Sequence, residues 1–197
     1  MPITLIDHRE DIAEPVSVSE LALFCRIDHH REDPLLSSWG KAAREWTENF
    51  TRRQLITAEW LLMLDRFPSP CRHDPFSAII LPLGSLQDVE TVKYLNESGV
   101  LTTMTETTDY IFDPGGDNAR IAPPYGKYWP PVLSQMNAVR VEFTCGYGDP
   151  VDVPDTIKGA IKRLVAHWYE YRDPGIPAQL RASLEEELSG YVLVELP

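Results

Sequence analysis

The sequence predicts an α+β protein in which an antiparallel-packed helical core carries an inserted small β-sheet unit. Two observations lead to this prediction. Apolar residues recur at helical spacing towards both ends of the chain, whereas the middle alternates short apolar runs with turns rich in proline and glycine. The core is therefore expected to contain two N-terminal and two C-terminal helices.

A length of 197 residues suits a single domain. Changes in composition along the chain divide this domain into successive segments. We expect an extended, unanchored N-terminal arm at 1–16, helices at 17–54, a β insertion at 55–147, C-terminal helices at 154–189 and an apolar tail at 190–197.

The first helix is predicted from a capping box, because Ser17 and Glu20 can satisfy each other's free backbone amides. Asp33 is expected to cap the second helix, with Pro34 in its first turn. An apolar stripe then follows at helical spacing to about Gln54, and it consists of Leu35, Leu36, Trp39, Ala42, Ala43, Trp46 and Phe50.

Short strands are expected in the middle of the chain, at 55–67, 79–82, 89–95, 100–102, 109–112, 119–122 and 138–145. Asp155 is then expected to cap a helix that ends near Arg172 and buries Ile157, Ile161, Leu164, Val165 and Trp168. A shorter helix is expected at 178–189.

The net charge of −12 argues against a protein that grips DNA by its phosphates. An acidic surface can nevertheless let a polyanion slide past without sticking.

No stretch approaches the roughly 18 apolar residues of a membrane span, and the acidic start does not resemble a secretory signal. Three widely spaced cysteines give no disulfide framework. We therefore expect a protein that is made and assembled in a cytoplasm.

Three patterns invite a chemical interpretation, and each has a simpler structural one. Cys71, His73 and Asp74 lie in one proline-flanked loop, without the further ligands that a metal site needs. The pair at 29–30, both histidines, reads as a polar turn between helices. Cys145 precedes a Gly-Tyr-Gly turn, but the nucleophile of a catalytic elbow would lie between the glycines. No catalytic residue, cofactor or metal is therefore predicted.

Asp113-Pro-Gly-Gly-Asp117 has only the composition of a calcium loop and is expected to be a β-turn. A separate aromatic cluster, Tyr125, Tyr128 and Trp129, occupies a proline-rich loop. It can serve as a partner-contact loop or cap the hydrophobic face of the sheet, and the sequence leaves both interpretations open.

Several motifs occur in a characteristic order. The capped helix from Ser17 is followed by WTENFTRRQL, LLMLDRFP, ILPLGSLQDVETVKYLNESG and FTCGYGDPVDVPDTIKGAIKRLVAHWYEYRD. Over about residues 15–175 this order resembles the head–tail connector (adaptor) proteins of tailed bacteriophages, prophages and gene-transfer particles.

The resemblance implies a structural virion protein and no enzyme. Such connectors form a dodecameric homo-oligomeric ring under the portal protein, extend the DNA channel and dock the tail or a stopper protein. DNA passes without sequence-specific binding, and no membrane is involved. By position, the family's portal-docking segment corresponds to Leu188, Tyr191, Val192, Leu193, Val194, Leu196 and Pro197, although GYVLVELP is more apolar than the family pattern.

Two alternatives remain open at this point. One is a small cysteine-dependent hydrolase or transferase, using Cys145 or Cys71 with His73 or His167. The other is a ligand-binding module that uses the Tyr125–Trp129 loop.

Overall fold

The computed structural model describes residues 3–7, 13–70, 77–115, 118–173 and 175–194. Over these residues the chain has four α-helices and two antiparallel sheets, which confirms the α+β class. The chain divides into two compact units. The sheet unit contains residues 1–9, 57–146 and 194–197, and the helical unit contains residues 10–56 and 147–193.

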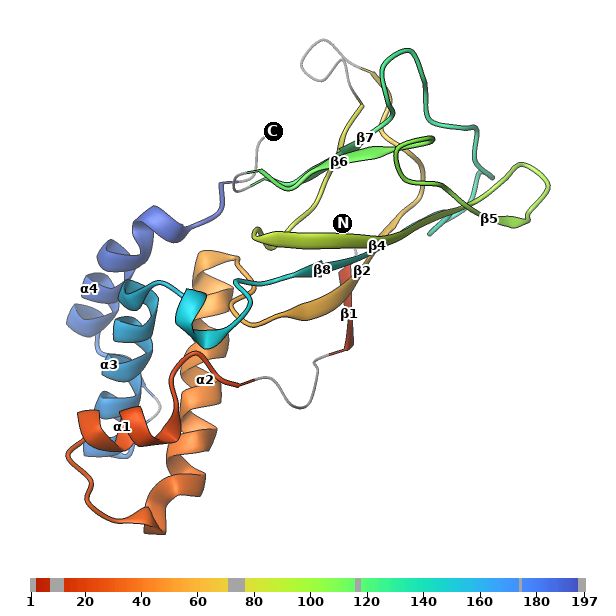
Figure 1. Ribbon diagram of the computed structural model, residues 1–197. Coiled ribbons are helices and arrows are strands. Elements are labelled where there is room, and N and C mark those ends of the chain that lie inside the picture. Colours follow the sequence, from red (N-terminus) through yellow and green to blue (C-terminus); the bar gives the residue numbers. More distant parts are fainter. Residues whose placement is uncertain (1–2, 8–12, 71–76, 116–117, 174, 195–197) are drawn as a thin grey trace. The chain divides into compact units, whose positions relative to one another are not determined.

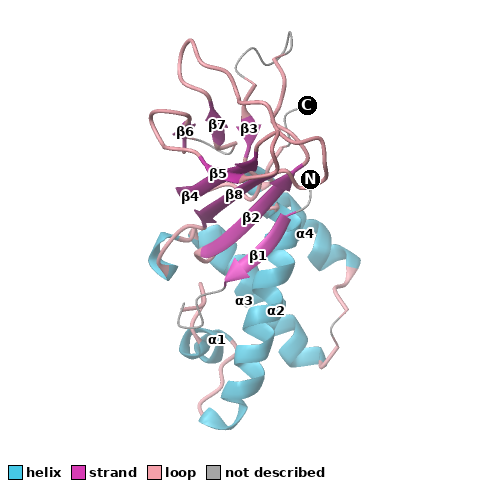
Figure 2. Ribbon diagram, turned by 90° about the vertical axis from the view of Figure 1, so that its right-hand side faces the viewer, coloured by secondary structure: helices cyan, strands magenta, loops and turns pink. Residues whose placement is uncertain are grey.

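The larger sheet of the sheet unit has five strands, visible in Figures 1 and 2. Its order is β1 (Ile3–Asp7), β2 (Ala58–Leu64), β8 (Val139–Cys145), β4 (Leu86–Leu95) and β5 (Leu101–Thr103). The smaller sheet has the order β3 (Ile79–Ile80), β7 (Arg120–Ala122) and β6 (Ile111–Asp113). The predicted strands are present, with their ends shifted by a few residues.

Strand β8 lies at the centre of the larger sheet, between β2 and β4. Its alternate side chains, Val139, Val141, Phe143 and Cys145, are all essentially inaccessible to solvent. They share one face because side chains alternate along a strand. This row was predicted from the sequence, and it forms the centre of the core of the sheet unit.

The N-terminal segment corrects an expectation. Residues 1–16 were expected to form an unanchored arm, but Ile3–Asp7 is strand β1 and pairs antiparallel with β2. Ile3 lies opposite Leu62 and also packs on the core. The pairing satisfies backbone groups that a free arm would leave to water. Ile3–Asp7 is extended, as predicted, but its pairing with β2 anchors it at the edge of the larger sheet.

The helical unit contains α1 (Val18–Phe24), α2 (Asp33–Thr51), α3 (Asp155–Tyr171) and α4 (Ala178–Leu188). Short 3-10 turns cover His30–Glu32, Pro150–Asp152 and Ser189–Tyr191. Helix α3 contacts each of the other three helices. The predicted stripes of α2 and α3 meet in one apolar core, which includes Leu36, Ala43, Ile157, Ile161 and Leu164. No helix in the described ranges is long and apolar enough to cross a membrane.

The helix starts confirm one predicted cap and correct two. Ser17 and Glu20 form the expected capping box at α1. The N-caps of α2 and α3 are Glu32 and Pro154, one residue before the predicted Asp33 and Asp155. At α2 the reason is the 3-10 turn, which runs directly into the helix. Both aspartates instead occupy the first helical turn, where the helix dipole favours a negative charge.

Glu20 gives the helical unit a pH-dependent contribution to stability. Hydrogen bonds from Ser17, followed by the nearby Lys162, lower the pKa of Glu20 to about 2. Its stabilising effect is present above its ordinary value of 4.5 and is lost as pH falls towards about 2. We expect Glu20→Gln to cost about 1 kcal/mol at neutral pH, because the side chain is partly exposed. Urea unfolding at neutral and acidic pH checks this, and equal losses at both would contradict it.

The chain turns sharply after β8. Gly146 and Gly148 have φ angles of 132° and 104°, which residues with a Cβ rarely adopt. Gly146 N–H donates a hydrogen bond to Ser85 O. The Gly-Tyr-Gly stretch is therefore a structural corner at the end of the strand, as the sequence indicated.

Candidate partner-binding groove

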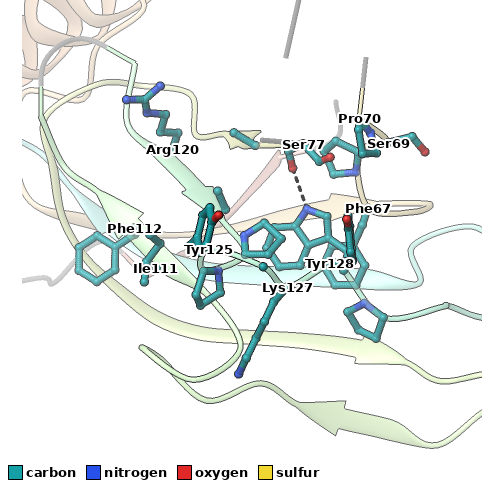
Figure 3. Close-up of a pocket in the computed structure, with 18 of the residues that line it drawn as sticks. Phe67, Ser69, Pro70, Ser77, Ile111, Phe112, Arg120, Tyr125, Lys127 and Tyr128 are labelled. Atoms are coloured by element: carbon teal, nitrogen blue, oxygen red, sulfur yellow. Dashed lines mark hydrogen bonds between the residues drawn. The ribbon is translucent and has the colours of Figure 1, made fainter. Parts of the chain in front are cut away.

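A cavity of about 820 Å³ lies in the sheet unit (Figure 3). Its walls come from the segment after β2, from β6 and β7, and from the loop at 122–132. This loop holds the predicted aromatic cluster. The cavity is rich in proline, since Pro68, Pro70, Pro123, Pro124, Pro130 and Pro131 all line it. We refer to this cavity as the aromatic groove.

The structure separates the three aromatic residues of the predicted cluster. Trp129 stacks on Phe67 with ring centroids 4.4 Å apart and an interplanar angle of 2°. Its indole Nε1 donates a hydrogen bond of 2.7 Å to Ser77 O. Trp129 thus packs on the core of the sheet unit, which is the capping role. Tyr125 and Tyr128 are 106% and 83% exposed, so their rings are available to a partner.

The charge of the groove differs from that of the whole chain. Its described lining contains Arg66, Arg120 and Lys127, but only Asp113 as an acid. Arg120 forms an ion pair of 3.1 Å with Asp113. A hydrogen bond from Gly115 N–H, followed by Arg120, lowers the pKa of Asp113, so this carboxylate stays charged. The groove therefore presents net positive charge on an acidic protein.

The tyrosines of the groove were predicted from the sequence, whereas its basic side chains were not. Arg66 and Arg120 lie 54 positions apart in the sequence, and only the folded sheet unit brings them to one cavity. Lys127 directly precedes Tyr128 in the sequence, so a positive charge beside the tyrosines was predictable from the sequence alone. Its Nζ donates a hydrogen bond to Thr108 O, which fixes the stem at the edge of the groove.

The C-terminal residues were expected to form an exposed apolar tail, and the structure corrects this in part. Leu188 and Leu193 are buried in the helical unit. Leu193 N–H donates a hydrogen bond of 2.9 Å to Thr51 O. Tyr191 and Val192 are half-buried, and Val194 is 70% exposed. Leu196 and Pro197 lie outside the described residues.

Of the candidate catalytic residues, the structure describes Cys145 and His167, which belong to different units. Cys145 is fully buried in the core of the sheet unit. His167 belongs to the helical unit, where its ring contacts Tyr171 and its Nε2 lies 3.2 Å from Gly175 O. His30 lies 3.0 Å from Asp33 at the surface, as expected for a polar turn.

The predicted loop with Cys71, His73 and Asp74 lies outside the described residues. Within the ranges that the structure describes, no group of three or more histidine, cysteine or acidic side chains could hold a metal ion.

Burial makes the Cys145 thiol testable. We expect it to be unreactive in the folded protein, since a reagent cannot reach a side chain at the centre of the sheet. In a Cys25→Ser, Cys71→Ser background, labelling should proceed only when the sheet unit unfolds. Rapid labelling under native conditions would contradict this and revive a nucleophilic role.

No family model matches the sequence, and no curated protein does. Solved structures do match. The chain shares its fold with chains of gene transfer agent (GTA) particles. A chain in the neck of the empty GTA particle, computed with C6 symmetry, has a TM-score of 0.80 and 20% identity. It covers 100% of this chain and 98% of its own length.

Two further structures agree with this match. A chain in the virion of the native GTA particle has a TM-score of 0.79 and 20% identity. A chain in the neck of the native GTA particle, computed with C12 symmetry, has a TM-score of 0.76 and 21% identity. Each covers 100% of this chain and 98% of the matched chain. The common fold therefore includes both the sheet unit and the helical unit.

Proposed function

We propose that this protein is a structural virion protein, a ring-forming head–tail connector of a phage-like particle. It would bind under the portal, extend the DNA channel and dock the tail or a stopper. The observation that carries the proposal is the match over the whole chain to a chain in the neck of a GTA particle. In this proposal the chain is one connector domain with an antiparallel-packed core of four helices. The protein has no catalytic role.

The proposed oligomer is a ring of twelve copies. The neck structures that share the fold were computed with C6 and C12 symmetry, which is consistent with a ring. A head-to-tail interface that closes on itself generates such a ring. The net charge of −12 suits a channel wall, because DNA would be repelled from it rather than bound.

The C-terminal end is the proposed contact with the portal, and the burial of its described residues supports a division of roles within it. Leu188 and Leu193 are already buried within the chain. They would anchor the segment, leaving Tyr191, Val192 and Val194, together with Leu196 and Pro197, to face the partner. Truncation at Ser189 would not test this contact cleanly, because it would remove the buried Leu193 from the core together with the residues proposed to bind the portal.

Val194→Asp is a sharper test, because Val194 is exposed and its replacement leaves the core intact. We expect its binding to purified portal to weaken by about tenfold or more, since the change places a charge in an apolar contact. Val151→Asp is the matched control, because Val151 is also an exposed valine. Equal binding by both variants would refute docking through the C-terminal end.

The ring itself is tested by imaging assembled particles by electron microscopy, with and without the intact gene. We expect a ring of this protein between head and tail, and free tails and unattached heads in its absence. Normal particles without the protein would refute the connector role. Monomeric behaviour in solution would be compatible with it, since assembly can require the portal.

A further inference from the structure

We propose that the aromatic groove binds an extended, acidic, proline-containing peptide segment of a partner protein. This site is separate from the C-terminal contact and does not depend on the connector role. Its chemistry follows from the exposed tyrosines, from the proline-rich walls and from the charge of the lining.

The aromatic surface indicates an extended segment that contains proline. Tyr125 and Tyr128 expose their rings almost completely, while the stacked pair of Phe67 and Trp129 lines the groove and packs on the core of the sheet unit. Aromatic-lined grooves recognise polyproline II segments, because that helix is already extended and loses little entropy on binding. Tyrosine suits such a site, since it supplies a large contact area with few rotatable bonds.

The groove is also preorganised on two sides. The Trp129 indole is fixed by its hydrogen bond to Ser77 O. Ile111 and Phe112 belong to strand β6, whose backbone is held by antiparallel pairing with β7. A rigid receptor surface lowers the entropic cost of capturing a flexible segment. The volume of about 820 Å³ is within the range of small binding cavities and exceeds what one side chain would fill.

Charge complementarity selects an acidic occupant. Three cations and one carboxylate line the groove within the described residues, whereas acids outnumber bases by 30 to 18 over the whole chain. Asp113 is already neutralised by Arg120. Arg66 is therefore the cation that remains to meet carboxylates of the partner, while the Lys127 ammonium, which already donates one hydrogen bond to Thr108 O, adds positive charge at the edge of the groove.

Single-stranded DNA also stacks on tyrosine and carries negative charge. A peptide is favoured because the chain as a whole has a net charge of −12, which repels a long polyanion more than a short acidic segment. The groove is also bordered by six prolines instead of the run of basic side chains typical of nucleic-acid binding.

The test measures binding of a short fluorescent peptide of alternating glutamate and proline pairs to the full chain, by anisotropy at low salt. We expect saturable binding that Tyr128→Ala weakens by about tenfold or more. Arg66→Ala should weaken binding several-fold and reduce its dependence on salt. Tyr171→Ala and Arg181→Ala, which alter exposed residues of the helical unit, are the matched controls and should bind as the native chain does.

Three companion ligands make each outcome decisive. Replacing glutamate by glutamine or proline by alanine in the peptide should weaken binding, and equal binding by either would overturn the stated chemistry. Tighter binding of an oligothymidine strand, sensitive to Tyr128→Ala, would assign the groove to nucleic acid instead. Absence of peptide binding would overturn the proposal, while a ring seen in particles would leave the connector role standing.

Discussion

Replacement of Arg44 by methionine is expected to lower the free energy of unfolding by about 3–5 kcal/mol. The Arg44 side chain is only 8% exposed, and it lies between two carboxylates. Its Nε is 2.8 Å from Glu14 Oε2, and its Nη1 is 2.6 Å from Glu48 Oε2. Methionine fills similar space but leaves both carboxylates without their cation in a poorly hydrated site.

Glu48 makes this loss dependent on pH. Burial raises the pKa of the Glu48 carboxyl even with Arg44 beside it, and removing the cation should raise it further. A carboxyl whose pKa is raised by folding stabilises the folded state when it is protonated, and this stabilisation is lost as pH rises through the folded pKa. The defect of Arg44→Met should therefore be smaller in acid than at neutral pH.

Guanidinium unfolding followed by circular dichroism at both pH values measures these effects. Lys41→Met is the matched control, because Lys41 is an exposed cation on the same helix. It should change stability by about 0.5 kcal/mol or less. A loss at Arg44 no larger than that at Lys41 would show that the ion pairs contribute nothing to stability.

Phe143→Ala is the second large expected effect, with a cost of about 3–5 kcal/mol. Phe143 is essentially inaccessible to solvent at the centre of β8, where it lies opposite Trp60 on β2 and Val89 on β4. Loss of the ring would leave a cavity bounded by paired strands, which can relax little. The stability of the sheet unit should fall accordingly.

Arg140→Ala, an exposed position on the same strand, is the control for backbone propensity. It should cost much less, since surface changes remain within about 0.5 kcal/mol. Thermal unfolding monitored by tryptophan fluorescence compares the two variants. Similar midpoints would show that the central strand is not the main source of stability in the sheet unit.

Features determined by neighbouring residues were predictable from the sequence. The capping box of Ser17 and Glu20 spans four positions, and the structure confirms it. The stripe of α3 and the inward row of β8 repeat with the period of their own element, so their buried faces were identified correctly. The stripe of α2 was correct only in part, because Ala42 is exposed whereas Arg44, Thr47 and Thr51 are buried. The corner at Gly146 was likewise visible as a local turn signal.

Features that depend on distant segments were missed. Nothing within Ile3–Asp7 shows that β2, some fifty positions later, supplies its hydrogen bonds. Leu193 looks like part of an exposed tail until Thr51 O is placed beside its amide. The positive lining of the aromatic groove also depends on distant segments, because only the folded chain brings Arg66 and Arg120 to the same cavity. The tyrosines were found because they are clustered in sequence.

The pairing of β1 with β2 has a consequence for biosynthesis. Strand β1 is translated before its partner β2, whose paired residues follow it by more than fifty positions. Helices α1 and α2 likewise cannot complete their packing until α3, in the last quarter of the chain, has been made. Neither unit can close on the nascent chain until most of it has been made, and apolar surface stays uncovered in the interval. We therefore expect the yield of this protein to depend on translation rate and on chaperone supply.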